Sequence, residues 1–213
     1  MNKKYINELF TTCIITLSLL ITNNPIGTTC LWSVFLIIYY KKNHGFFNSA
    51  ITLSLYMKNY YTTADMLLLV INQAIGSSLA LIIFKFISGS FFTPDQIPLE
   101  TMPFLIGIES ICTFILCNVI LTMKNIDAQD NTKKNIIHTV FIYTLGHIAT
   151  QSLGGILNPS FGAAVLIITA FFNRSAETNL LNSAYYSMLY CITPLLLGLL
   201  TPYLKNIAET ENE

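Results

Sequence analysis

Charge is the scarcest feature of this sequence. Only 10% of its 213 residues are Asp, Glu, Lys or Arg, against about 25% in an ordinary soluble domain. Hydrophobic residues make up 53%, and the mean hydropathy is +0.58. A soluble chain of this length has too small a core to hide that much apolar surface, whereas lipid tails solvate it. The composition therefore favours a membrane protein over a soluble domain.

The sequence also has no excess of positive or of negative charge, because Lys plus Arg and Asp plus Glu both number 11. No basic stripe is present to neutralise phosphates, which excludes a nucleic-acid partner. The five cysteines lie in apolar runs without metal-ligand spacing, so we expect small buried hydrophobes and no metal site. No Ser-His-Asp set and no phosphate-binding loop is evident. We therefore expect a protein that is not an enzyme and needs no cofactor.

Apolar stretches long enough to cross a hydrocarbon core of about 30 Å occur six times. They are residues 5–22, 26–40, 64–88, 102–123, 136–152 and 181–204. Two further apolar pieces, 48–57 and 158–172, are too short to span, and each follows a break rich in polar residues or glycine. Irregular backbone at membrane depth is tolerated only where it is buried in protein or lines a watery cavity. Two half-length helices therefore predict a cavity.

The basic residues predict the orientation. With six spans, nine of the eleven fall on one side of the membrane, and the positive-inside rule places that side in the cytoplasm. The connectors 22–25 and 89–101 contain no Lys or Arg and would lie outside. We therefore expect an integral membrane protein with cytoplasmic N- and C-termini. The sequence does not say whether the membrane is the plasma membrane or an intracellular one.

The same order of elements occurs twice, in halves of about 5–88 and 102–204 within one membrane domain over 1–213. Each half opens with a glutamate-bearing span, Glu8 or Glu109, and continues with a span, a short segment and a last span. Because each half has three spans, the second copy enters from the opposite side, which is the inverted-repeat plan. The alternative is two unrelated groups of hydrophobic helices.

An asparagine followed by helix-starting residues opens each short segment. The two openings are Asn48-Ser49-Ala50 and Asn158-Pro159-Ser160. Asn is a good N-cap, and Pro is well tolerated at the first helical position. Two helix N-termini that face each other would place partial positive charges at the centre of a pore. There the Asn amides would donate hydrogen bonds to a passing oxygen, and the field would oppose cations and protons.

Both segments, with their surroundings 44–52 and 154–160, resemble the two NPA loops of the aquaporin (major intrinsic protein) family. Ser49 replaces the usual proline of the first loop and Ser160 the usual alanine of the second. The likeness extends to the glutamates of the family's first and fourth spans, its third-span glutamine and a proline in its last span. The matching residues here are Glu8, Glu109, Gln73 and Pro194.

This resemblance implies an all-α, aquaporin-like fold with six transmembrane helices and two re-entrant half-helices, assembled as a homotetramer of independent pores. It also implies that Asn48 and Asn158 are the central donors. Glu8, Gln73 and Glu109 would then be buried groups that hold the re-entrant loops, since a carboxylate inside a membrane is costly unless it is paired. The alternative for Glu8 is a position at the membrane interface.

A basic residue is missing from the family's outer filter. The position three residues after Asn158, where the family has arginine, is Phe161. The expected filter comprises Thr28, Gly146, Gly155 and Phe161, with His147 as the alternative one step from Gly146. Such a filter would be less polar and wider than one that passes only water. His147 otherwise packs neutral against the loops.

The sequence thus predicts a passive channel for water, with glycerol and other small neutral solutes as further candidates. A secondary transporter is a second hypothesis, but it would need ionisable coupling groups at the midplane, and few exist beyond Glu8 and Glu109. A third is an aquaporin-fold protein that conducts poorly and has an interaction or structural role. Ser49 and the missing arginine keep this alternative open.

Overall fold

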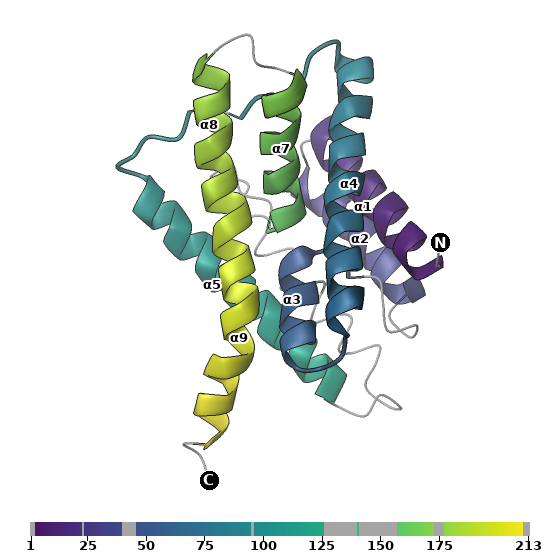
Figure 1. Cartoon of the computed structure of the whole chain (residues 1–213), viewed down its shortest axis with the longest axis vertical. Coiled ribbons are helices and arrows are strands. Elements are labelled where there is room, and N and C mark those ends of the chain that lie inside the picture. Colours follow the sequence, from purple (N-terminus) through teal and green to yellow (C-terminus); the bar gives the residue numbers. More distant parts are fainter. Residues whose placement is uncertain are drawn as a thin grey trace.

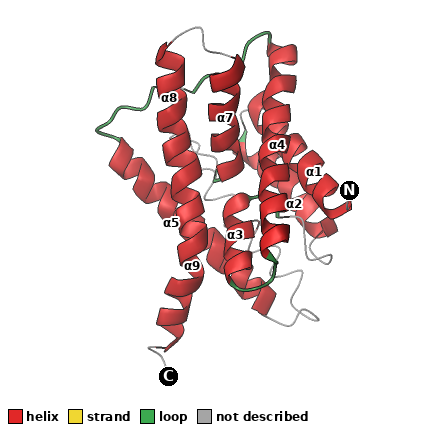
Figure 2. Cartoon of the chain, in the orientation of Figure 1, coloured by secondary structure: helices red, strands yellow, loops and turns green. Residues whose placement is uncertain are grey.

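Helices make up all of the regular structure in the part of the chain that the computed structural model describes (Figure 2). The described residues are 3–22, 24–39, 46–94, 96–125, 140, 157–172 and 177–210. Four helices are long and apolar enough to cross a membrane: Lys3–Thr22, Thr63–Ser88, Met102–Thr122 and Leu180–Leu204. The expectation of an all-helical chain with helices of transmembrane length and hydropathy is therefore confirmed.

The described part of the first half contains two long and two shorter helices. They are α1 (Lys3–Thr22), α2 (Pro25–Tyr39), α3 (Ser49–Met57) and α4 (Thr63–Ser88). With 9 residues, α3 is roughly 14 Å long and cannot cross a bilayer alone. The longest of the four, α4, begins at the cap residue Thr62 and ends where Gly89 adopts a left-handed backbone, a conformation that glycine tolerates best.

The second half repeats this mixture of long and short helices. Its described elements are α5 (Met102–Asn125), α7 (Pro159–Phe172), α8 (Glu177–Ser187), the π-helical turn η2 (Met188–Ile192) and α9 (Thr193–Thr210). The last three follow one another without a break and form one long rod (Figure 1). The expected fifth span, 136–152, lies outside the described residues apart from Val140.

The two short helices lie end to end between α4 and the α8–α9 rod (Figure 1). The N-terminus of α3 faces that of α7, so the two helices run in opposite directions away from the middle of the molecule. Each packs against the last helix of the other half, α3 on α9 and α7 on α4. The short helices therefore tie the two halves together.

Glycines permit the closest approaches between these helices. A side chain at Gly198 of α9 would place its Cβ 2.5 Å from the Ala50 carbonyl oxygen on α3, and one at Gly76 of α4 would collide with the Leu9 carbonyl on α1. Small residues at such positions let the backbones of membrane helices come together. Elsewhere on these helices, large apolar side chains such as Ile71 of α4 and Ile111 of α5 are exposed.

Candidate functional site

The centre of the molecule is built from the first residues of α3 and α7. Asn48 has extended backbone angles and caps α3, because its Oδ1 accepts a hydrogen bond of 2.9 Å from the Ala50 N–H. Asn158 does the same for α7, accepting from the Ser160 N–H at 3.2 Å. Both asparagines are buried. The capping role expected of each residue is therefore present at both helices.

The amide nitrogens of the two asparagines form a reciprocal pair of hydrogen bonds across the centre. Asn48 Nδ2 donates to the Leu157 carbonyl at 2.6 Å, and Asn158 Nδ2 donates to the Phe47 carbonyl at 3.0 Å. Each asparagine thus caps its own helix with its oxygen and holds the opposite segment with its nitrogen. Because an amide nitrogen carries two hydrogens, each side chain has a second N–H to offer.

The residue before each asparagine has an uncommon backbone. Phe47 has φ 53° and Leu157 has φ 52°, a left-handed conformation that costs a bulky residue about 1–2 kcal/mol. Both side chains are buried, and both carbonyls accept the amide of the opposite asparagine. The strained backbone is therefore part of the reciprocal contact. Sequence analysis missed it, since neither residue is a glycine.

A chain of hydrogen bonds runs from α7 to α1 beside the asparagines. Ser49 Oγ donates to Gln73 Oε1 at 2.8 Å and lies 2.5 Å from Ser160 Oγ. A hydroxyl has one hydrogen, and Ser49 uses its own on Gln73, so Ser160 must donate to Ser49. Gln73 Nε2 in turn donates to Glu8 Oε2 at 2.9 Å and to Thr52 Oγ1 at 3.1 Å.

Glu8 lies at the end of this chain, inside the protein, with 2% of its surface exposed. Besides Gln73, it accepts a hydrogen bond of 3.2 Å from the Phe47 N–H. Glu8 thus contacts the segment immediately before α3, and it does so from α1. This contact holds the strained backbone at Phe47 against α1.

Glu109 occupies the corresponding place in the second half and is 1% exposed. The Leu157 backbone lies beside its carboxyl group, as the Phe47 backbone lies beside Glu8, but neither carboxyl oxygen has a hydrogen-bond partner among the described residues. A threonine follows each glutamate by four residues, Thr12 and Thr113, and both threonines are fully buried. This Glu-x-x-x-Thr repeat was visible in the sequence and was overlooked.

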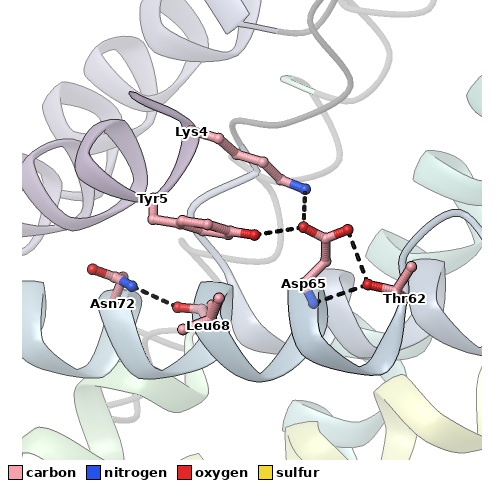
Figure 3. A network of polar contacts seen from close by, with 6 residues as sticks. All are labelled: Lys4, Tyr5, Thr62, Asp65, Leu68 and Asn72. Atoms are coloured by element: carbon pink, nitrogen blue, oxygen red, sulfur yellow. Dashed lines mark hydrogen bonds and ion pairs between the residues drawn. The ribbon is translucent and has the colours of Figure 1, made fainter. Parts of the chain in front are cut away.

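A second polar cluster joins the N-terminal ends of α1 and α4 (Figure 3). Asp65 Oδ1 accepts from Lys4 Nζ at 3.0 Å and from the Tyr5 hydroxyl at 2.7 Å, while Thr62 caps α4 through the Asp65 N–H. Lys4 Nζ also lies 4.7 Å from the ring centroid of Tyr61. Burial raises the pKa of the Tyr61 hydroxyl above its ordinary value. The Thr-x-x-Asp capping pattern was the available sequence signal for this cluster.

The expected filter residues are only partly described. Thr28 of α2 is buried, and its hydroxyl donates to the Asn24 carbonyl at 3.0 Å. Phe161 of α7 is buried between two other aromatic rings, with its centroid 5.5 Å from that of Phe92 and 6.2 Å from that of Tyr186. Neither neighbour was foreseen. Gly146, His147 and Gly155 lie outside the described residues.

The described part of the chain defines a class: it is all-helical, has four helices long and apolar enough to cross a membrane, and has two short helices that meet at their N-termini. Neither a scan against protein-family models nor a search of curated proteins gave a match. The argument for function therefore rests on the arrangement of residues at the centre.

Proposed function

We propose that the chain is a passive transmembrane channel for water and for small neutral solutes such as glycerol. The observation that carries the proposal is the meeting of α3 and α7 at their N-termini, with Asn48 and Asn158 bonded to the opposite segments. Helix N-termini bear partial positive charge, and the two amides provide donors for a passing oxygen. This combination attracts neutral hydrogen-bond acceptors and opposes cations and protons.

The proposed fold has six membrane spans, with α3 and α7 as re-entrant half-helices of an inverted repeat. The reciprocal contacts support it, because each short helix packs on the last helix of the other half. The left-handed residues Phe47 and Leu157 occur at equivalent places, as a repeat requires. In this proposal residues 136–152 form the fifth span, and both termini are cytoplasmic. The apolar run at 136–152 supports the first statement, and the excess of basic residues on one side supports the second.

Glu8 and Gln73 act in this proposal as anchors of the first re-entrant loop. Glu8 accepts from the backbone of Phe47, and Gln73 connects it to Ser49. A carboxylate engaged in this way has a structural task and is a poor coupling group for a transporter, which would have to gain and lose an ion in each cycle. Glu109 is proposed as the anchor of the second loop from its place alone, because it is buried beside the Leu157 backbone. A homotetramer is part of the proposal through the resemblance alone.

The burial of Phe161 favours a second candidate function, an aquaporin-like protein that conducts poorly and acts through its partners. A buried phenylalanine packed between Phe92 and Tyr186 stands where the family has the arginine of its outer filter. The two candidates differ in a measurable way, since only the first predicts flux of water and solute.

Purified protein in proteoliposomes tests the proposal through light scattering after an osmotic step. We expect vesicles with protein to shrink faster than empty vesicles in an impermeant osmolyte, and to re-swell faster in glycerol. Imposed sodium or proton gradients should leave both rates unchanged. Dependence on a gradient would indicate a transporter, and rates equal to those of empty vesicles, with protein shown to be folded, would favour the poorly conducting alternative.

A further inference from the structure

One aromatic face of α2 contacts the segment that leads into α3. Trp32, Phe35 and Tyr39 are spaced by three and four residues, which places them on the same side of a helix. The indole N–H of Trp32 donates a hydrogen bond of 3.0 Å to the Phe46 carbonyl. The centroid of the Phe47 ring lies 6.1 Å from that of Phe35 and 5.8 Å from that of Tyr39, both in edge-to-face contact. This face of α2 therefore holds both residues of the segment.

A single peptide unit of this segment is held by two helices. The carbonyl that accepts from Trp32 and the N–H that donates to Glu8 at 3.2 Å belong to the same peptide bond, the one between Phe46 and Phe47. A trans peptide is planar, so its C=O and its N–H point in opposite directions. Helix α2 therefore holds this peptide on one side and α1 on the other. Rotation of the peptide plane would break both hydrogen bonds.

The orientation of this peptide determines the backbone conformation of Phe47. The angle φ of Phe47, 53°, describes rotation about the bond between its nitrogen, which belongs to the held peptide, and its Cα. A left-handed conformation is unfavourable for a bulky residue and persists where surrounding contacts impose it. Here two hydrogen bonds hold the peptide, and the rings of Phe35 and Tyr39 hold the side chain. Contacts from α1 and α2 thus impose the conformation of Phe47.

Phe47 connects this hold to the second half of the chain. Its carbonyl accepts a hydrogen bond of 3.0 Å from Asn158 Nδ2, and Asn158 also caps α7. If the preceding peptide turned and φ returned to the common negative range, the Phe47 carbonyl would point away from Asn158. The indole N–H on α2 therefore acts on the asparagine of α7 through two consecutive peptide units.

We infer that Trp32 is a positioning residue of the channel, an inference that rests on the function proposed above. Its indole N–H orients the peptide between Phe46 and Phe47, and the Phe47 carbonyl then orients the amide of Asn158. Trp32 is the only tryptophan of the sequence and is 1% exposed. A residue that only filled the core would need the shape of the indole ring, whereas a positioning residue needs its N–H. The two roles can therefore be separated by experiment.

A tryptophan analogue with sulfur in place of the ring N–H makes this separation, because it keeps the shape of the ring. With this analogue at position 32, we expect osmotic water permeability per folded protein to fall about fivefold, the scale set by the loss of one hydrogen bond. A fluorinated tryptophan, which keeps the N–H, should retain the wild-type permeability. Wild-type permeability with the sulfur analogue would overturn the positioning role.

Ser33→Ala is the matched control on α2. The Ser33 hydroxyl is also buried, but it donates to the Thr29 carbonyl of its own helix at 2.6 Å. We expect this variant to keep the wild-type permeability. A fall of the same size as with the sulfur analogue would show that any lost hydrogen bond of α2 has this effect, and would overturn the particular role of Trp32.

The hold on the peptide can also be measured without any flux. In the full-length protein in detergent, hydrogen exchange of the Phe47 amide should be about fivefold faster with the sulfur analogue than with the fluorinated one, because a peptide released at its carbonyl also leaves Glu8 more often. Equal exchange rates would show that Trp32 does not orient the peptide, and would overturn the inference. Faster exchange in a protein whose wild type shows no flux would establish the contact but remove the proposed function and, with it, the role of Trp32 in a channel.

Discussion

At the scale of single residues, the hydrogen bonds beside the two asparagines have a direction that can be assigned. Ser49 gives its only hydroxyl hydrogen to Gln73, so the short contact with Ser160 requires Ser160 to donate. Gln73 in turn donates a hydrogen bond to Glu8. Because every donor points toward the carboxylate, the chain has one direction, and it links the start of α7 to α1.

Ser49→Ala is expected to disturb both permeability and stability. It removes the bridge to Ser160 and leaves Gln73 Oε1 buried without its donor, which costs about 1–3 kcal/mol. Ser54→Ala is the matched control, because it deletes a buried hydroxyl from the same helix that donates to the Gly198 carbonyl at 2.6 Å and does not touch α7. We expect only Ser49→Ala to change the ratio of glycerol to water flux. A change of the same size in both variants would contradict a special role for the serine bridge.

Asn158→Asp should damage conduction strongly. It replaces the amide donor that reaches the Phe47 carbonyl with a carboxylate oxygen at a desolvated position, where charge is costly. We expect water permeability to fall by about tenfold or more, because two carbonyl-type oxygens then face each other.

Asn118→Asp controls for the introduced charge, since Asn118 is a partly buried asparagine of α5 whose amide donates to the Phe114 carbonyl of its own helix. Its osmotic shrinkage rate per folded protein should stay near that of the wild type. If Asn158→Asp kept wild-type permeability, the path could not pass between the two asparagines.

At the scale of elements, the sequence predicted the helices that depend on local signals. The short pieces expected at 48–57 and 158–172 appear as α3 and α7, because an asparagine cap precedes each apolar run. The contacts between segments could not be predicted in the same way. The left-handed backbone at Phe47 and Leu157 and the packing of Phe92 on Phe161 depend on residues more than about forty positions away in the chain, and no local propensity encodes such contacts.

Gly198→Ala tests the close packing of α9 on α3. The added Cβ would lie 2.5 Å from the Ala50 carbonyl oxygen, so the helices must separate, at a cost of about 1–3 kcal/mol. Gly107→Ala in α5 is the matched control, since nothing lies within 4 Å of the Cβ it would add. Thermal unfolding in detergent should show a lower midpoint for Gly198→Ala and an equal or higher midpoint for Gly107→Ala, which gains helix propensity. The reverse order would place α9 away from α3.

At the scale of the whole molecule, the two halves contact each other through equivalent helices. Their buried glutamates, however, differ in hydrogen bonding. In the first half Glu8 receives hydrogen bonds from both Phe47 and Gln73. In the second, the carboxyl oxygens of Glu109 have no partner among the described residues. An inverted repeat needs the same arrangement of helices in both halves, but it does not need the same side chains around each anchor.

In the proposed function, water and solute pass through the junction of α3 and α7. Among the described residues, α1, α4, α5 and the α8–α9 rod contain the helices long and apolar enough to cross a membrane, and their exposed apolar flanks are the surface that this proposal assigns to lipid. The short helices α3 and α7 provide the helix dipoles, and Asn48 and Asn158 provide the amide donors. Passage of water through such a junction requires no conformational cycle, so its rate should depend weakly on temperature, unlike diffusion through the lipid itself.

The temperature dependence of osmotic water permeability in proteoliposomes therefore tests the central claim most directly. The account predicts a permeability well above that of empty vesicles, with a clearly lower activation energy, and loss of both differences in Asn158→Asp. Fast shrinkage that kept the activation energy of bare lipid, or no acceleration from folded wild-type protein, would contradict the claim that this chain forms a water-conducting pore.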